Sequence, residues 1–196
     1  RKYAHRDAVA NDSNWNWLTL AQHHGLPTRL MDWTFSPYVA MHFATANLES
    51  FHIDGVIWAV DYVKVHAALP EALRRELRVE GADLFTVEML DRAAPGIDGL
   101  GQISGGPFLL FLEPLSVDDR VVNQYALLSV MSDVTAHVDQ WLAERPDMYA
   151  RYIIPAALKW EIRDKLDQAN VTERVLFPGL DGLSTWLKRH YTPRHE

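Results

Sequence analysis

The chain contains no cysteine among its 196 residues. Disulfide scaffolds, thiolate metal sites and cysteine nucleophiles are therefore excluded. It also lacks a run of eighteen apolar residues and a signal-peptide pattern at its start. We therefore expect a soluble protein that does not span a membrane, and a reducing cytoplasm agrees with the missing disulfides.

The chain also lacks an excess of basic charge, because its formal net charge is −7. Proteins that hold duplex nucleic acid usually present a basic face. The basic cluster of this sequence lies at its end and is interpreted as a solvated tail: Lys188, Arg189, His190, Arg194 and His195. A nucleic-acid substrate held in a cleft stays open, because total charge says little about one cleft.

Several catalytic motifs are missing: G-x-S-x-G, the P-loop, the dinucleotide-binding G-x-G-x-x-G and H-E-x-x-H. Their absence argues against a serine hydrolase, a kinase, a Rossmann enzyme and a zinc protease. His23 and His24 are adjacent on an expected helix, about 100° apart, and do not suit one metal ion. We predict no metal site.

The composition favours a packed core, since 48% of the residues are hydrophobic and seven are Trp. The length suits a single domain over residues 1–196. Helices are expected over residues 13–24, 67–77, 135–144, 158–169 and 180–191, and strands over residues 28–33, 55–62, 83–89, 108–112, 120–131 and 152–154. Residues 93–106 are expected to form a loop. Because the order lacks a regular βαβ rhythm, we predict the α+β class, with a mixed or split β-sheet and flanking helices.

The segment Gln22–Ala44 is the most informative part of the sequence. A helix is expected to start at the N-cap Ser13 and to end at Gly25, where a left-handed residue fits and Pro27 forbids continuation. A second helix is expected to start at Pro37 with Ser36 as its N-cap. The segment therefore predicts a helix, a tight turn, a strand, a turn and a helix.

Polar side chains are dense in this segment, and a buried polar group without a partner costs about 1–3 kcal/mol. They must pair internally or serve a ligand. The candidates are His24, Thr28, Arg29, Asp32, Trp33, Thr34 and Ser36.

Four of these candidates have a structural alternative. Arg29 is expected either to bind an anionic group or to pair with Asp32. If residues 28–34 alternate, Thr28, Leu30, Asp32 and Thr34 share one face, and that pair is disfavoured. His24 is expected either to act in the site or to cap its helix, and Trp33 either to pack in the core or to stack on a ring.

The stretch Arg120–Met131 is expected to be a strand in which Gln124 shares one face with Val122 and Ala126. A neutral amide in an apolar strand must find partners. Gln124 is therefore either a buried structural amide or a ligand contact facing a cleft, with Tyr125 beside it.

The run QHHGLPTRLMDWTFSPYVAMHFA resembles the core motif of the FRG domain family. The stretch DDRVVNQYALLSVMSD and the closing segment Lys159–Leu187 also fit, so the resemblance covers about Trp15 to Leu187. The family's Phe/Tyr-Arg-Gly triplet is absent from this sequence and is expected upstream of Arg1. If its arginine is part of the site, this chain holds an incomplete site.

Asp32-Trp-Thr-Phe-Ser36, followed by Ala40 and Phe43, also looks like the second motif of ADP-ribosyltransferases. This resemblance implies an ADP-ribosyltransferase-like fold and NAD as a substrate. Asp32, Gln124 and His24 are the implied catalytic residues. The implied contacts to NAD are Thr28, Arg29, Trp33, Thr34, Ser36 and Tyr125. Gln124 would fill the third motif position, where it orients a hydroxyl but is no base.

The resemblance implies a toxin or phage-defence effector, as in a toxin–antitoxin pair, that modifies a protein or nucleic-acid acceptor and has an antitoxin partner. Two rival functions stay open. One is a non-catalytic module that binds a nucleotide or a partner, which the neutral Gln124 and the missing arginine favour. The other is a hydrolase of NAD or nucleotides.

Overall fold

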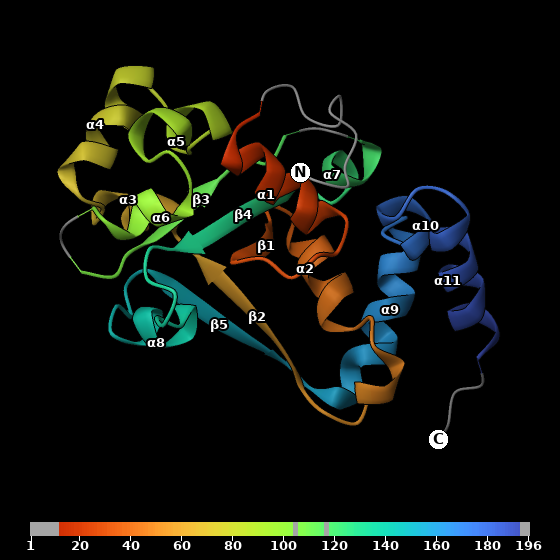
Figure 1. The fold of residues 1–196 in the computed structure, drawn as a ribbon. Helices are drawn as coiled ribbons and strands as arrows, with labels where there is room; N and C mark the ends of the chain where they lie inside the picture. The colour runs from red at the N-terminus through yellow and green to blue at the C-terminus, as the bar shows by residue number, and fades with distance from the viewer. Residues whose placement is uncertain (1–11, 104–105, 116–117, 193–196) are drawn as a thin grey trace. The chain divides into compact units, whose positions relative to one another are not determined.

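A computed structural model of the chain describes residues 12–103, 106–115 and 118–192. Helices are interspersed with strands, and the strands form two separate sheets of three and two strands (Figure 1). The predicted α+β class is therefore confirmed. None of the helices in the described part combines the length and apolar character that a membrane span needs.

The chain divides into two compact units. Unit 1 comprises Arg1–Trp33, Val60–Leu115 and Leu127–Ala150, and unit 2 comprises Thr34–Ala59, Ser116–Ala126 and Arg151–Glu196. The segment Gln22–Ala44 passes from the first unit to the second between Trp33 and Thr34. The prediction of a single domain stays a prediction.

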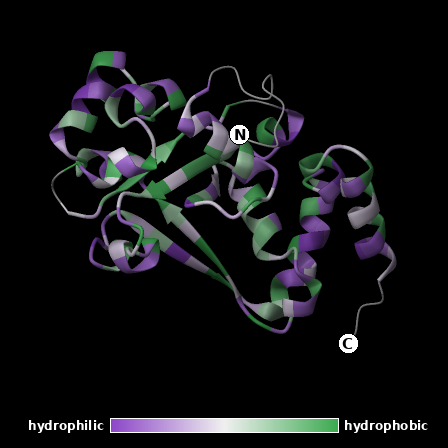
Figure 2. Ribbon diagram, in the orientation of Figure 1, coloured by the Kyte–Doolittle hydropathy of each residue, from purple (hydrophilic) through white to green (hydrophobic). Residues whose placement is uncertain are grey.

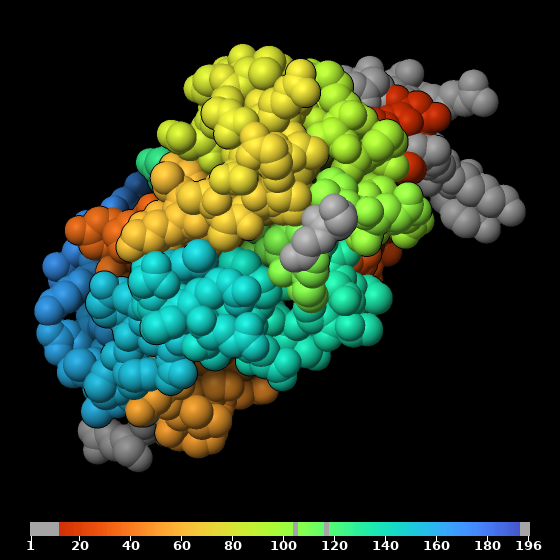
Figure 3. Space-filling view, turned by 90° about the vertical axis from the view of Figure 1, so that its left-hand side faces the viewer, coloured from red at the N-terminus to blue at the C-terminus, as the bar shows by residue number. Residues whose placement is uncertain are grey.

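Unit 1 holds the three-stranded sheet, in the order β1-β4-β3, and the helices that cover it. Helix α4 and the segment around α8 lie at its surface (Figure 3). Its elements are α1 (Asn14–His23), β1 (Leu30–Thr34), α3 (Tyr62–Ala67), α4 (Glu71–Glu80), α5 (Val87–Ala93), α6 (Ile97–Gly101), β3 (Leu109–Leu112), β4 (Ala126–Met131) and α8 (Val138–Ala143).

The core of unit 1 is apolar. Strand β3 is buried along its whole length and pairs antiparallel with β4, with Leu109 opposite Met131 and Leu112 opposite Leu128. Figure 2 shows the hydrophobic colour along these strands, whereas α4 carries hydrophilic residues beside hydrophobic ones. Such a continuous apolar run suits a strand covered on both faces. Trp15 is fully buried beside this core, and its indole donates to the carbonyl of Ala94 at 2.9 Å.

Unit 2 contains the two-stranded sheet β2-β5 and several short helices. Its elements are α2 (Pro37–Ala44), the 3-10 helix η2 (Leu48–Ser50), β2 (Gly55–Val60), α7 (Asp119–Asn123), β5 (Tyr149–Ile154), the 3-10 helix η3 (Ala156–Leu158), α9 (Lys159–Gln168), α10 (Glu173–Leu176) and α11 (Leu180–Tyr191).

The predicted helix ends around Gln22–Ala44 are confirmed. The side chain of Ser13 accepts from the main-chain N–H of Asn16, and that of Ser36 accepts from Val39. Gly25 adopts the left-handed conformation, with a φ of 77°. Local capping chemistry therefore decides where these two helices begin and where the first one ends.

Four other local predictions are wrong. The helix over residues 67–77 is broken before Pro70, which starts α4. The strand over residues 83–89 is reduced to an isolated bridge at Phe85, and α5 begins at Val87 because Thr86 caps a helix there. The loop over residues 93–106 contains α6. The strand Arg120–Met131 is α7 followed by β4, because Asp118 caps a helix with its carboxylate.

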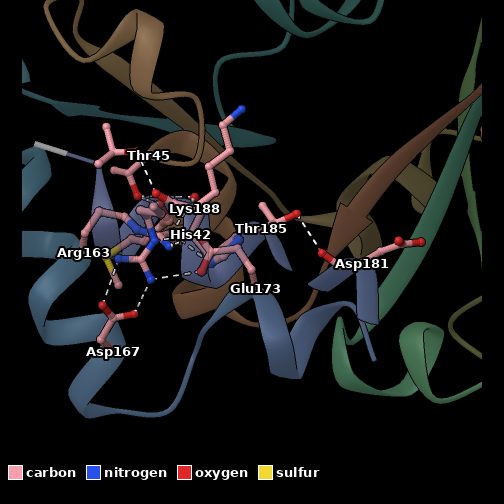
Figure 4. Close-up of polar contacts among 11 residues, drawn as sticks. His42, Thr45, Arg163, Asp167, Glu173, Asp181, Thr185 and Lys188 are labelled. Atoms are coloured by element: carbon pink, nitrogen blue, oxygen red, sulfur yellow. Dashed lines mark hydrogen bonds and ion pairs between the residues drawn. The ribbon is translucent and has the colours of Figure 1, made fainter. Parts of the chain in front are cut away.

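Unit 2 is built around buried charges. Glu173 accepts from Arg163 at 2.5 Å, and Figure 4 shows these two residues beside Asp167. Glu173 also accepts from Arg189 at 2.7 Å, and Arg189 forms a two-pronged pair with Asp167. Arg163 is fully buried, and Glu173 and Arg189 nearly so. We call Arg163, Asp167, Glu173 and Arg189 the ionic network. The two arginines and two carboxylates balance, which buried charges require.

The buried face of α9 is not wholly apolar. Lys159, Arg163 and Leu166 are buried, whereas the apolar residues Leu158 and Ala169 at the two ends of the helix are exposed. Arg163 takes a core position because Glu173 neutralises it. A pattern of apolar residues cannot reveal a buried cation whose partner lies on another helix.

Glu173→Gln tests the network. The substitution leaves two buried guanidinium groups with only Asp167 as a carboxylate partner, so we expect a loss of about 3–5 kcal/mol in unfolding free energy. Urea unfolding measures this loss. Glu161→Gln is the matched control, because Glu161 forms an exposed pair with Lys165 on the same unit. It should change stability by less than about 1 kcal/mol, and equal losses in the two variants would contradict the role of Glu173.

Candidate functional site

A pocket of about 470 Å³ opens in unit 2, within the range of small-ligand sites. Four segments of this unit line it: the start of α2, the end of α7, the turn after α9, and α10. The lining residues are Phe35, Ser36, Tyr38, Val39, Val122, Asn123, Tyr125, Ala169, Asn170, Val171, Val175 and Leu176. None of these residues carries a charge. The pocket therefore suits an uncharged or aromatic ligand group better than a free phosphate.

Two lining residues have unusual backbone conformations. Tyr125 has a φ of 48° and Asn170 a φ of 60°, and they are the non-glycine residues with positive φ within the described part of the chain. Asn170 follows the end of α9, and its N–H donates to the carbonyl of Asp167. The N–H of Val171 donates to the carbonyl of Leu166. This is a common helix ending in which Asn is accepted.

Tyr125 is less easily explained. It follows the C-cap of α7, as Gly25 follows the C-cap of α1. Its N–H donates to Val122 and its carbonyl accepts from Phe35, which holds the left-handed conformation. A bulky residue pays a steric cost there. The ring nevertheless stays 60% exposed at the pocket, so it adds little to the core.

Two further exposed aromatic side chains line the same pocket: Phe35 and Tyr38. Ser36 lies between these two residues in the sequence and is the N-cap of α2. Aromatic faces bind planar rings by stacking, and the amide of Asn170 can both donate and accept a hydrogen bond. The lining therefore offers the groups that recognise a heteroaromatic ring.

The pocket is connected to the ionic network through His42. This side chain is buried in α2, its Nδ1 lies 2.9 Å from Arg163 Nη1, and its ring hydrogen-bonds with the backbone of Val171 in the pocket wall. Burial lowers the pKa of His42 to about 4, and the charge of Arg163 acts in the same direction. Nδ1 therefore accepts from Arg163 as part of a neutral imidazole.

Glu173 remains ionised in this setting. Burial by itself would raise its pKa, but the hydrogen bond from Arg189 and the charge of Arg163 lower it below its usual value. Burial by itself would lower the pKa of Arg189. The hydrogen bonds of Arg189 to Asp167 and Glu173 outweigh this effect and raise its pKa. The network is therefore held together by full charges under ordinary conditions.

The predicted site residues fall into two groups. Thr34, Ser36, Gln124 and Tyr125 lie in unit 2, and the hydroxyl of Thr34 donates to the carbonyl of Gln124 at 2.7 Å. Ser36 and Tyr125 line the pocket directly. The second group, in unit 1, contains His24, Thr28, Arg29, Asp32 and Trp33. The functional roles assigned to both groups stay predictions.

The expected setting of Gln124 is wrong. It is the C-terminal cap of α7 instead of a strand residue, so it does not alternate with Val122 and Ala126. Its side-chain amide donates to the carbonyl of Leu176 at 2.9 Å. This hydrogen bond joins α7 to α10. Gln124 therefore does not occupy the strand position that the third ADP-ribosyltransferase motif would require.

In unit 1, Gln22 joins two of the candidates. Its amide donates to Asp32 at 2.7 Å, and its carbonyl oxygen accepts from the hydroxyl of Thr28 at 2.6 Å. This shared partner agrees with the expected placement of Thr28 and Asp32 on one face, although Leu30 of that face is buried while Asp32 is exposed. Strand β1 lies at the edge of its sheet, which leaves Asp32 open to solvent.

The remaining unit 1 candidates make structural contacts. Arg29 donates to the carbonyls of Met131 and Ser132, at 2.9 and 3.2 Å. The indole of Trp33 donates to the hydroxyl of Ser129 at 2.8 Å, and His24 caps α1 from an exposed position. Among the described residues, no three His, Asp or Glu side chains gather as a metal site would need.

Sequence reasoning missed several residues that build the pocket: Phe35, Tyr38, Asn170, Val171 and the network beneath them. Asn170 had a usable signal, because Asn often follows a helix end. Arg163 and Glu173 had none, because they are ten residues apart in separate helices and their pairing depends on the fold.

The comparison with protein families finds a match in the N-terminal stretch of the chain. Residues 1–52 match the family model of the FRG domain. The FRG resemblance is thereby confirmed over this stretch, which includes α1, β1 and α2; residues 1–11 of it lie outside the described part. The later segments that also resembled the family lie beyond the match. No curated protein and no solved structure matches the chain.

The pH dependence of stability tests the setting of His42. Because the folded state keeps this imidazole neutral, its contribution is complete above pH 6.5 and is lost as the pH falls toward about 4. We expect the unfolding free energy to fall across this window, more steeply in the wild type than in His42→Asn, which keeps an acceptor for Arg163. Urea unfolding at a series of pH values measures both slopes.

Buried His66 acts in the same direction, because burial lowers its pKa, so both proteins should retain some pH dependence. His24→Asn is the control at an exposed histidine and should follow the wild type. Parallel curves for the wild type and His42→Asn would contradict a neutral His42.

Proposed function

We propose that the pocket of unit 2 binds the planar ring of a nucleotide, and that NAD is the ligand. The observation that carries this proposal is Tyr125, an exposed aromatic residue held in a left-handed conformation at the rim of the pocket. The proposal keeps a binding role for Ser36 and Tyr125 and assigns new ones to Phe35, Tyr38 and Asn170.

Tyr125 adopts an unfavourable backbone conformation without a matching gain in burial. The left-handed conformation costs a residue with a Cβ roughly 1–2 kcal/mol, and a ring that is 60% exposed recovers little of this by burial. At three other helix ends in the described part of the chain, Gly or Asn takes the left-handed conformation. A stacked ligand ring would gain contact area from Tyr125 that the unliganded fold does not use.

The uncharged lining limits which part of NAD enters. A nicotinamide or adenine ring suits aromatic walls, and its amide or ring nitrogens suit the side chain of Asn170. The pyrophosphate would lie outside the pocket, where solvent or a positively charged side chain meets it. This division agrees with a module that binds the ligand by one ring.

A second candidate function is ADP-ribosyl transfer from the bound NAD, in an ADP-ribosyltransferase-like fold. It is favoured by one arrangement: β1 ends at Thr34, and Ser36 caps α2 at the pocket, in the order of the motif that the sequence resembles. In this reaction the bond between nicotinamide and ribose breaks, nicotinamide leaves with the electron pair, and a nucleophile of the acceptor bonds to the ribose carbon and loses its proton.

The transfer candidate implies a toxin or phage-defence effector with a protein or nucleic-acid acceptor and an antitoxin partner. Water in place of the acceptor would make the chain an NAD hydrolase. The neutral side chain of Gln124, already bound to Leu176, supplies no base for either reaction. Binding is therefore the function that the geometry supports best.

Calorimetric titration with NAD, with assays for released nicotinamide and for a labelled acceptor, separates these functions. The proposal predicts binding without turnover. Nicotinamide release together with a labelled acceptor would establish transfer, and release alone would establish hydrolysis. Absence of binding would overturn all three for this chain.

Tyr125→Gly separates binding from stability. Glycine accepts the left-handed conformation, so we expect the unfolding free energy to stay the same or to rise by up to about 1 kcal/mol. The affinity for NAD should fall by at least about tenfold, since base–aromatic stacking contributes roughly 1–3 kcal/mol. Thermal unfolding and calorimetry measure the two effects.

Tyr125→Phe should retain binding, because it keeps the ring. Tyr152→Ala is the control at a tyrosine that is also 60% exposed in unit 2 but does not line the pocket. Full affinity in Tyr125→Gly would place the ligand elsewhere.

A further inference from the structure

Helix α11 carries an apolar stripe that faces solvent. The exposed fractions of its residues are 83% for Leu180, 39% for Leu183, 38% for Leu187 and 77% for Tyr191. Each residue of an α-helix turns by about 100°, so steps of three and four residues keep all four on one side. We call these four residues the α11 stripe.

The opposite side of α11 is the one that packs inside unit 2. Gly182 and Arg189 are its buried residues. A Cβ at Gly182 would lie 1.9 Å from the carbonyl oxygen of Phe177, so α11 approaches the preceding turn there as closely as a backbone can. Arg189 joins the ionic network through its pairs with Asp167 and Glu173. The helix is therefore anchored by a polar face and presents its apolar face outward.

This arrangement inverts the usual pattern of a surface helix, which buries its apolar stripe. Single exposed apolar residues are ordinary, but a continuous row along a helix marks an interaction surface. The charges beside the stripe indicate which partner fits it.

Asp181 and Lys188 are both exposed and flank the same edge of the stripe, because they are seven residues apart, close to two helical turns. Asp181 lies near the start of the helix and Lys188 near its end. When two copies of α11 pair antiparallel, Asp181 of one copy comes opposite the partner's Lys188, and the reverse pair forms at the other end. The surface is therefore complementary to itself.

We propose that the α11 stripe is the contact between two copies of this chain, paired antiparallel about a two-fold axis near Ser184 and Thr185. Leu183 of one copy then packs against the partner's Leu187, and the reverse. The small side chain of Ser184 lies next to the axis and lets the two helices approach closely. A two-fold interface uses the same patch on both subunits, which this pattern of residues provides.

The dimer is weak by this account. Helix α11 has 12 residues and is about 18 Å long. Two helices of this length bury less surface than the roughly 1,200–2,000 Å² of a stable interface. We therefore expect a monomer–dimer equilibrium that depends on protein concentration and does not involve the pocket.

Analytical ultracentrifugation of the 196-residue chain over a range of concentrations tests the contact. The wild type should shift from monomer to dimer as its concentration rises, and Leu187→Glu should abolish the shift. Val79→Glu is the matched control, because Val79 is 72% exposed on α4 of unit 1 and should leave the equilibrium unchanged. Thermal unfolding confirms that each variant is folded.

A charge exchange tests the antiparallel arrangement. Asp181→Lys places two lysines opposite each other at both ends of the interface and should weaken the dimer about tenfold. The double variant Asp181→Lys, Lys188→Asp should restore it, because each pair again has opposite charges. A monomer at every concentration, a dimer that survives Leu187→Glu, or a double variant no better than the single one would overturn the proposal.

Discussion

The carboxylate of Glu173 holds two guanidinium groups in the interior of unit 2, and this contact joins three of its helices. Arg163 reaches it from α9 and Arg189 from α11, while Glu173 itself begins α10. Asp167 supplies the second negative charge. Buried charges of this kind tolerate the loss of a partner poorly, so each member of the network is needed to keep the three helices together.

The pocket depends on the same contact. Its walls come from the start of α2, the turn after α9 and α10, and each of these is joined to the network: α2 through His42, α9 through Arg163 and α10 through Glu173. The network thus lies behind the walls and leaves the lining uncharged. A frame of this type can keep Tyr125 exposed and strained, whereas a looser unit would let it relax.

Local signals in the sequence predicted the parts of the fold that local chemistry decides. Ser13, Gly25 and Ser36 marked helix ends, and the apolar run at 108–112 marked the buried strand β3. The errors came where a short capped helix interrupts an apolar or β-branched stretch, as at Thr86 and Asp118. For the site, the sequence indicated Ser36 and Tyr125 but not Arg163 or Glu173, because a buried ion pair between helices leaves no periodic trace.

The central claim is that a planar ring occupies the pocket against Tyr125, and a crystal structure of the chain with NAD tests it most directly. The account predicts ring density stacked on the face of Tyr125, within hydrogen-bonding reach of the Asn170 amide, and a pyrophosphate outside the lining residues. NAD bound in unit 1, against Arg29 and Asp32, with the unit 2 pocket empty, would contradict it.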